Sequence, residues 1–134
     1  MRKPYVRPMP WTWFLRTAAY RRFMIRELTS VFIAAYLVFL LVWLHRLGEG
    51  PEAFGKMLQA TRTPWSVVLH VLALAAAVYH SVTWFNLTPQ VMPVRIGEER
   101  LPHSAVAIAM GYLPWLVLSG LIIWGVLRYC LLYT

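Results

Sequence analysis

The chain has 134 residues and a formal net charge of +8, yet 60% of its residues are hydrophobic and only 13% are charged. The apolar residues gather in long blocks that basic residues flank, which is typical of a membrane protein. Because the positive charge is confined to the ends of these blocks, we expect it to act at the membrane surface and not to bind nucleic acid.

The segment before the first block is typical of a helix that lies in the membrane–water interface, since it mixes basic and aromatic side chains. Prolines at positions 4, 8 and 10 keep its start extended. Its basic region is long and no small-residue cleavage pattern follows the first block, so we expect it to be retained and not cleaved as a signal peptide. The aromatic and basic residues are Trp11, Trp13, Phe14, Tyr20, Phe23, Arg16, Arg21 and Arg22.

Three blocks, at about residues 28–47, 65–85 and 104–127, are long enough to cross a hydrocarbon core of about 30 Å as helices. Backbone groups in lipid must be satisfied within the protein, and the blocks lack the strict alternation of barrel strands. We therefore predict an all-α membrane protein with three transmembrane helices, forming one anchor domain over residues 1–134.

The two connections differ in their predicted structure. Gly48, Gly50 and Pro51 end the first span, and a short surface helix is expected from about Pro51 to Gln59. The second connection carries prolines at positions 89, 93 and 102, which predict a loop.

The basic residues predict the orientation, because Lys and Arg favour the cytoplasmic side. With three crossings, nine of the thirteen basic residues fall on the side of the N-terminus and second connection. We therefore expect a multi-pass protein of the bacterial inner membrane with its N-terminus in the cytoplasm. The basic face would also attract anionic lipid headgroups.

Four residues are expected at one membrane edge. Arg26 and Glu27 precede the first span, while His80 and Trp84 end the second span, which returns to the same side. Together they suit a molecule that carries electrons and protons within lipid. Each also has a structural interpretation: Glu27 favours a helix start, Arg26 sets topology, and tryptophans are common at membrane interfaces. A polar residue such as His80 inside the boundary usually faces the protein interior.

Two other histidines raise the question of a haem. His45 and His70 fall near the outer ends of their spans, and histidines on facing helices can bind haem iron from either side. His70 and His80 cannot bind one haem together, because they lie at opposite ends of the same helix. No metal site is predicted, and the single cysteine, Cys130, excludes an intrachain disulfide and a cysteine-bound iron–sulfur cluster.

Four stretches resemble one family, in order and over nearly the whole chain. The chain is similar to the fumarate reductase C subunit, the hydrophobic membrane anchor of bacterial quinol:fumarate reductase. The stretches are Arg2-Lys3-Pro4-Tyr5-Val6-Arg7-Pro8-Met9, Tyr20-Arg21-Arg22-Phe23-Met24-Ile25-Arg26-Glu27, Gly50-Pro51-Glu52-Ala53 and His80-x-x-Thr83-Trp84-Phe85.

The resemblance implies three transmembrane helices that pair with a second membrane anchor, the fumarate reductase D subunit. It also implies an iron–sulfur subunit and a flavoprotein on the cytoplasmic side, which hold the iron–sulfur clusters and FAD. Menaquinol would be oxidised where these subunits meet. The subgroup is haem-free, so the resemblance implies no haem.

The resemblance also implies roles for particular residues. The family's quinone-site glutamate, histidine and tryptophan match Glu27, His80 and Trp84, and Arg26 matches the neighbouring arginine. The family often has Gly-Thr-Ala after the glutamate, whereas this chain has Leu28-Thr29-Ser30. This difference leaves the charged groups intact, but it could narrow the quinone site or add the hydroxyl of Ser30 to it.

The expected function is positioning of a quinol with proton transfer. Oxidising a quinol releases two electrons and two protons. Glu27 is expected to take a proton, His80 to bind a quinol oxygen and Arg26 to stabilise developing negative charge. Alone, the chain is expected to catalyse nothing.

Three alternatives remain open from the sequence. A succinate dehydrogenase anchor would differ in direction and usually carries haem b. A small proton-coupled exporter also uses a glutamate in its first span, but has four spans and a deeper glutamate. A passive assembly scaffold would tolerate loss of both Glu27 and His80.

The predicted orientation can be checked at Cys130, which three crossings from a cytoplasmic N-terminus put near the outer surface. A membrane-impermeant thiol reagent is expected to label Cys130 in intact cells. Labelling only after the cytoplasmic face has been opened would reverse the assigned orientation.

Overall fold

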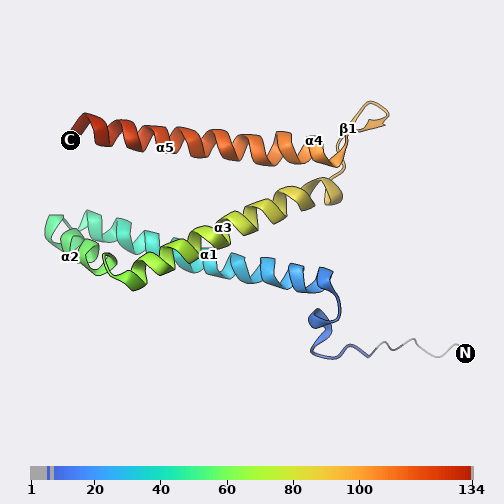
Figure 1. The fold of residues 1–134 in the computed structure, drawn as a ribbon, viewed down its shortest axis with the longest axis horizontal. Coiled ribbons are helices and arrows are strands. Elements are labelled where there is room, and N and C mark those ends of the chain that lie inside the picture. Colours follow the sequence, from blue (N-terminus) through green and yellow to red (C-terminus); the bar gives the residue numbers. More distant parts are fainter. Residues whose placement is uncertain (1–5, 7, 134) are drawn as a thin grey trace, which may run out of the picture. The chain divides into compact units, whose positions relative to one another are not determined.

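The computed structural model describes residue 6 and residues 8–133. The chain divides into two compact units, one ending at His80 and the other beginning at Ser81 (Figure 1). Three helical stretches are long and apolar enough to cross a membrane: Ala18–Gly48, Pro64–Val91 and His103–Leu132. The prediction of an all-α membrane protein with three spanning helices is confirmed.

The first span begins earlier than the sequence pattern predicts. Helix α1 runs over Ala18–Gly48, and the side chain of its N-cap residue, Thr17, accepts a hydrogen bond from the N–H of Tyr20 at 3.2 Å. At 1.5 Å per residue its 31 residues measure about 46 Å, so the helix is longer than the hydrocarbon core is thick. The basic residues of its first turns are thus helical while remaining within reach of water.

The residues before α1 form a short 3₁₀ turn, η1 (Trp13–Leu15), instead of a longer interfacial helix. The ring of Trp13 meets that of Tyr20 edge to face, with centroids 5.4 Å apart. This contact folds the segment back on the start of α1. Pro4, expected to keep the chain start extended, lies outside the described residues.

The first connection is a tight turn followed by a short helix, as predicted. Gly50 has φ 111°, which favours glycine, and α2 (Pro51–Thr61) follows it directly. Trp43 of α1 packs edge to face on Phe54 of α2, with centroids 5.2 Å apart. At the turn, a hydrogen bond of 2.7 Å from Arg46 lowers the pKa of Glu49.

Helix α3 (Pro64–Val91) returns antiparallel to α1 within the first unit. His70 contacts Tyr36 of α1, whereas His80, ten residues later on α3, contacts Thr29, which comes earlier on α1. The two helices therefore run in opposite directions. Ser66 and Ala73 of α3 are buried, and such small side chains let membrane helices approach closely. This antiparallel pairing positions the polar groups described below.

The C-terminal end of α3 continues past Pro89, where a loop was expected. Three side chains of this end donate hydrogen bonds to carbonyls four residues earlier: Asn86 to Val82, Thr88 to Trp84 and Gln90 to Asn86. Pro89 is fully buried and lacks the N–H that would bind the carbonyl of Phe85. These side-chain bonds add donors to neighbouring carbonyls, and none of the three replaces the N–H that the carbonyl of Phe85 loses at Pro89.

The second connection contains a small hairpin within the expected loop. Strands β1 (Arg95–Ile96) and β2 (Glu99–Arg100) pair antiparallel, and Gly97 between them has φ 62°. Positive φ is what a two-residue hairpin turn requires, and glycine adopts it without strain.

The third span is interrupted by a wider turn. It consists of α4 (His103–Ala107), a π-helical turn η2 (Ile108–Tyr112) and α5 (Leu113–Tyr133). Pro114 follows this turn and cannot donate to the carbonyl of Met110, so the wider turn accommodates a proline within the span. The hydrophobic pattern predicts a continuous helix here and gives no sign of the interruption.

A close contact in the second unit joins the wider turn to the end of α3. A Cβ added to Gly111 would lie 2.7 Å from the ring of Phe85. The Phe85 ring also meets Tyr112 and Trp115, with centroids 5.1 and 5.9 Å apart. Asn86 donates a hydrogen bond of 2.8 Å to the hydroxyl of Tyr112. The absence of a side chain at Gly111 is therefore what permits this packing.

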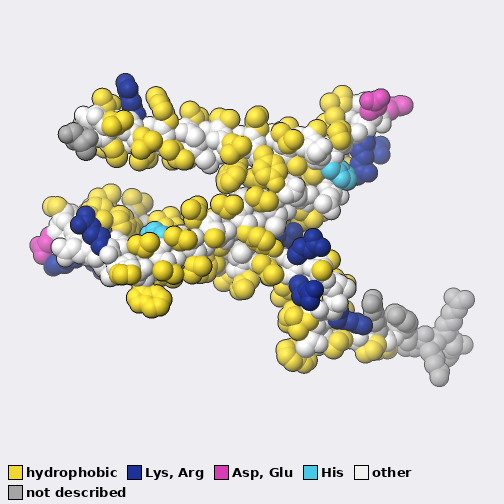
Figure 2. All heavy atoms as spheres, viewed as in Figure 1, with side chains coloured by type: hydrophobic (Ala, Val, Ile, Leu, Met, Phe, Trp, Pro, Cys, Tyr) yellow, Lys and Arg dark blue, Asp and Glu magenta, His cyan; other side chains and the backbone are white. Residues whose placement is uncertain are grey.

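Apolar side chains cover the helices along their lengths, and charged side chains lie near helix ends and in connections (Figure 2). In the most apolar part of each span, few residues are buried within the chain: 0% in Ala18–Gly48, 6% in Pro64–Val91 and 17% in His103–Leu132. Such apolar surface is stable only against lipid or another apolar protein surface.

Gly111→Ala is expected to destabilise the second unit because the new methyl group must displace the Phe85 ring. Overpacking of this kind costs about 1–3 kcal/mol. Gly120→Ala is the matched control, since nothing lies within 4 Å of the added Cβ. Circular-dichroism melting of the purified chain in detergent should show a lower midpoint only for the Gly111 variant. Equal midpoints would contradict the close contact.

Candidate functional site

A hydrogen-bonded cluster joins the early part of α1 to α3 within the first unit. The hydroxyl of Thr29 donates to the carbonyl of Arg26 at 2.6 Å. The same hydroxyl lies 3.1 Å from Nδ1 of His80, which is also 3.3 Å from the carbonyl of Arg26. Arg26 and His80, both predicted as site residues from the sequence, are therefore brought together, and Thr29 lies between them.

The side chain of Arg26 is held against α1 itself. It is 12% exposed, its Nε lies 3.5 Å from Oε1 of Glu27, and its guanidinium carbon lies 5.3 Å from the centroid of the Phe23 ring. A charged group with so little exposure needs an opposite charge or an aromatic face nearby, and it has both. The guanidinium is thus a fixed positive charge beside the carboxylate.

Glu27 and Ser30 share a local bond on α1. The hydroxyl of Ser30 donates to the carbonyl of Glu27 at 2.6 Å, and the side chain of Glu27 is 46% exposed. The hydrogen of the Ser30 hydroxyl is therefore committed to the backbone, and its oxygen can serve only as an acceptor. The half-exposed carboxylate of Glu27 is accessible to water.

Trp84 lies one turn after His80 on α3, at the start of the second unit. Trp84 is 40% exposed. Its backbone carbonyl accepts a hydrogen bond of 2.8 Å from the hydroxyl of Thr88. An i, i+4 separation puts the two side chains on the same face of one helix.

The cluster combines groups that suit a ligand with both apolar and proton-bearing parts. It offers an imidazole, a carboxylate in contact with a guanidinium, and hydroxyl groups that are already oriented by the backbone. Groups oriented before a ligand arrives need no reorganisation when charge develops. Proton transfer between a bound hydroxyl and water is therefore the chemistry that these residues support.

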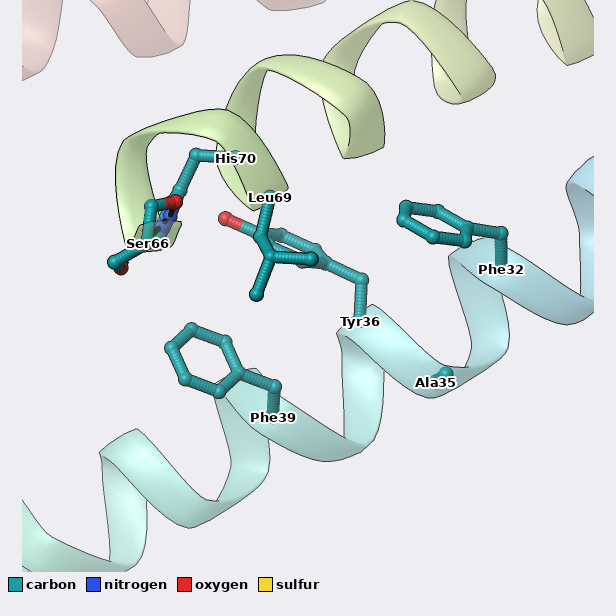
Figure 3. A pocket seen from close by; sticks show the side chains of 7 residues that line it. All are labelled: Phe32, Ala35, Tyr36, Phe39, Ser66, Leu69 and His70. Atoms are coloured by element: carbon teal, nitrogen blue, oxygen red, sulfur yellow. Dashed lines mark hydrogen bonds between the residues drawn. The ribbon is translucent and has the colours of Figure 1, made fainter. Parts of the chain in front are cut away.

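A separate pocket of about 250 Å³ lies further along the same two helices (Figure 3). It is lined by Phe32, Ala35, Tyr36, Phe39, Ser66, Leu69 and His70. His70 donates from Nδ1 to the carbonyl of Ser66 at 2.6 Å, and its ring meets Tyr36 and Phe39 edge to face at 5.6 and 5.7 Å. His70 and His80 are about 15 Å apart along the helix axis, so this pocket is distinct from the cluster.

The two histidines considered as haem ligands lie at different levels of the helix pair. His70 packs beside Phe39, whereas His45 lies about 9 Å further along α1 and is 3.3 Å from Glu49. His45 is also largely exposed. Two rings that bind one iron from either side must face each other, so this pairing does not fit. Among the described residues, no group of three or more metal-binding side chains is found.

Thr29 is the residue of this cluster that the sequence pattern does not single out. Threonine one helical turn after a charged residue is common, and here it is one position of the stretch Leu28-Thr29-Ser30. Its partner, His80, is 51 residues away, so only the packing of α3 on α1 reveals the contact.

The fold and this cluster define an integral membrane protein with three spans and a polar site near one end of its first helix pair. The family model for the C subunit of fumarate reductase matches residues 1–127. The chain belongs to the fumarate reductase C subunit family.

Named relatives agree with this assignment. The chain is 36% identical over 123 residues to the fumarate reductase C subunit of Mycobacterium tuberculosis, covering 92% of this chain and 97% of the relative. It is 40% identical over 108 residues to the fumarate reductase C subunit of Aliivibrio fischeri, covering 81% and 85%. The match to the Vibrio cholerae protein is 36% over the same length. The chain is thus a membrane anchor of fumarate reductase that works in a complex with other subunits of that enzyme.

Proposed function

We propose that this anchor helps to bind menaquinol and take up its protons as it is oxidised, and that it attaches the catalytic subunits to the membrane. The observation that carries the proposal is the hydrogen-bonded junction of Arg26, Thr29 and His80, with Glu27 beside it. A histidine held by contacts with α1 presents a defined group to a ligand within lipid.

Each residue has a distinct task in this proposal. His80 binds a quinol oxygen, and Glu27, half exposed and next to Arg26, accepts a proton and passes it to water. The guanidinium of Arg26 stabilises negative charge that develops on the quinol oxygen. Ser30 contributes a hydroxyl oxygen, and Trp84 provides an apolar wall for the ring.

The electrons released by menaquinol oxidation must pass to redox groups in partner subunits. This chain has one cysteine, too few to hold an iron–sulfur cluster, so a cluster in an iron–sulfur subunit would receive them and pass them to FAD in a flavoprotein. The extensive apolar surface of the three spans suits a second membrane anchor, the fumarate reductase D subunit, together with lipid. The basic N-terminal side supports an inner-membrane protein with a cytoplasmic N-terminus and catalytic partners on that face.

Glu27→Leu and His80→Ala are expected to lower menaquinol-dependent fumarate reduction strongly in membranes that contain the whole complex. Losing a well-placed proton-transfer group costs about 10²-fold in rate. Fumarate reduction with a soluble artificial electron donor should stay nearly unchanged, which shows that the complex has assembled.

Two exposed residues offer matched controls. Glu52→Leu removes an exposed carboxylate that pairs with Lys56, and His45→Ala removes an exposed histidine near the turn. Both controls should keep normal menaquinol oxidation. If Glu27→Leu and His80→Ala also keep it, the chain acts only as an assembly scaffold.

The purified anchor complex is expected to carry no haem, because His45 and His70 lie at different levels of the helix pair. A dithionite-reduced absorption spectrum should lack a b-type α-band. A stoichiometric band that disappears on His70→Ala would instead indicate an anchor of the haem b type.

A further inference from the structure

The three basic side chains around the first connection differ in their partners. Arg46 donates a hydrogen bond of 2.7 Å to Glu49, and Lys56 donates one of 2.8 Å to Glu52. Arg62 directly follows α2, and none of the residues that the structure describes forms an ion pair with its guanidinium. Its positive charge is therefore available to an anion from outside the chain.

A groove of about 470 Å³ lies beside Arg62, lined by residues of α1, α2 and α3. This volume is within the range of about 300–1,000 Å³ that is usual for ligand sites. Trp43 of α1 forms part of the lining, and Val67, Val71 and Leu74 of α3 form a stripe at i, i+4 and i+7 on one helix face. The stripe extends about 15 Å from the start of α3, so the groove joins a cation at one end to an apolar surface.

The level of the groove relative to the membrane follows from its neighbours. Trp65, in the first turn of α3, is largely exposed, and such tryptophans lie at the level of the lipid headgroups. Arg62 comes three residues earlier, and its long side chain keeps the charge in the same polar layer. The guanidinium is thus at the depth of lipid phosphates, and the stripe on α3 is at the depth of acyl chains.

We propose that this groove binds one anionic phospholipid, whose phosphate pairs with Arg62 and one of whose acyl chains lies along Val67, Val71 and Leu74. A guanidinium binds phosphate through two parallel N–H···O bonds, which suits it to this task. The site is at the opposite end of the first helix pair from His80, so the inference does not depend on the proposed function.

The polar groups of the groove favour a headgroup with net negative charge. Thr61 also lines the groove, but its hydroxyl donates to the carbonyl of Leu58 at 2.9 Å, so the charged contact comes from Arg62. None of the described lining residues is acidic, so the groove offers no partner for the ammonium group of a zwitterionic lipid. Phosphatidylglycerol, which has no such group, is therefore expected to bind better than phosphatidylcholine.

A helix of a partner subunit is the alternative occupant of the apolar stripe. Such a helix would cover Val67, Val71 and Leu74, but it would have to bring a carboxylate to the headgroup level to pair with Arg62. A phospholipid supplies both the anion and the apolar chain in one molecule. The two occupants differ in what lies against Val71, and this difference can be measured.

The first test measures lipid binding to the whole purified complex by native mass spectrometry. Phosphatidylglycerol and phosphatidylcholine with identical acyl chains are titrated separately. We expect tighter binding of phosphatidylglycerol, and Arg62→Gln should weaken it roughly fivefold, as expected for one basic contact with an anionic headgroup. Arg62→Lys should retain most of the affinity. Lys56→Gln is the matched control, because it removes the same charge from a neighbouring ion pair and should have no effect.

A second variant tests the acyl-chain part of the site without changing any charge. Val71→Trp should fill the groove and weaken phosphatidylglycerol binding, whereas Val68→Trp, on the same helix but outside the groove lining, should not. Excess inorganic phosphate should not release the lipid, because it lacks an apolar chain. Release by inorganic phosphate would show an anion site without lipid recognition and would overturn the proposal.

Photocrosslinking identifies the occupant directly. The complex carries a photoreactive benzoylphenylalanine in place of Val71 and is placed in bilayer discs with equal amounts of the two lipids. An adduct of this chain with phosphatidylglycerol in excess over phosphatidylcholine is expected, and the excess should disappear in Arg62→Gln. Crosslinking to another subunit, or equal capture of both lipids, would overturn the proposal.

Assembly and independence from the quinone site are checked with the same samples. Fumarate reduction with a soluble artificial electron donor reports the amount of complete complex. If Arg62→Gln does not assemble, Arg62→Lys and Val71→Trp still test the two halves of the site. His80→Ala should leave phosphatidylglycerol binding unchanged, so failure of the lipid site and failure of the proposed function are distinguishable.

Discussion

Hydrocarbon offers no hydrogen bonds, so each backbone N–H and C=O group within the spans must be satisfied by the protein itself. Three long helices meet most of this requirement. Two prolines interrupt the pattern within the spans: α3 continues through Pro89, and a π-helical turn precedes Pro114. The same constraint favours hydrogen-bond partners for polar side chains within the spans, as the contacts of Thr29 and Ser30 illustrate.

The Thr29–His80 contact shows how this constraint produces a site. The hydroxyl of Thr29 donates to the carbonyl of Arg26 on α1, and its oxygen lies within hydrogen-bonding distance of Nδ1 of His80 on α3. One short side chain thus links the two helices. Small residues such as Ser66 and Ala73 let the helices approach, and the charged pair of Arg26 and Glu27 lies beside the contact. Packing and chemistry therefore depend on the same helix pair.

The membrane environment also explains the division of labour in the enzyme. A chain whose spans bury little of their surface internally needs lipid and partner proteins to cover it. Its single cysteine is too few to hold an iron–sulfur cluster. As a member of the fumarate reductase C subunit family, it accordingly functions within a complex.

The sequence by itself determined the three spans, the turn at Gly50 and the family, because hydrophobic block length and motif order are local properties of the chain. It also selected Arg26, Glu27, His80 and Trp84 as candidates, and their roles remain proposals. Only the tertiary structure decided which α1 residue meets His80, that α3 continues past Pro89, and that Gly111 accommodates Phe85. These features depend on helix rotation and on contacts between distant residues, which residue type and spacing along the chain do not specify.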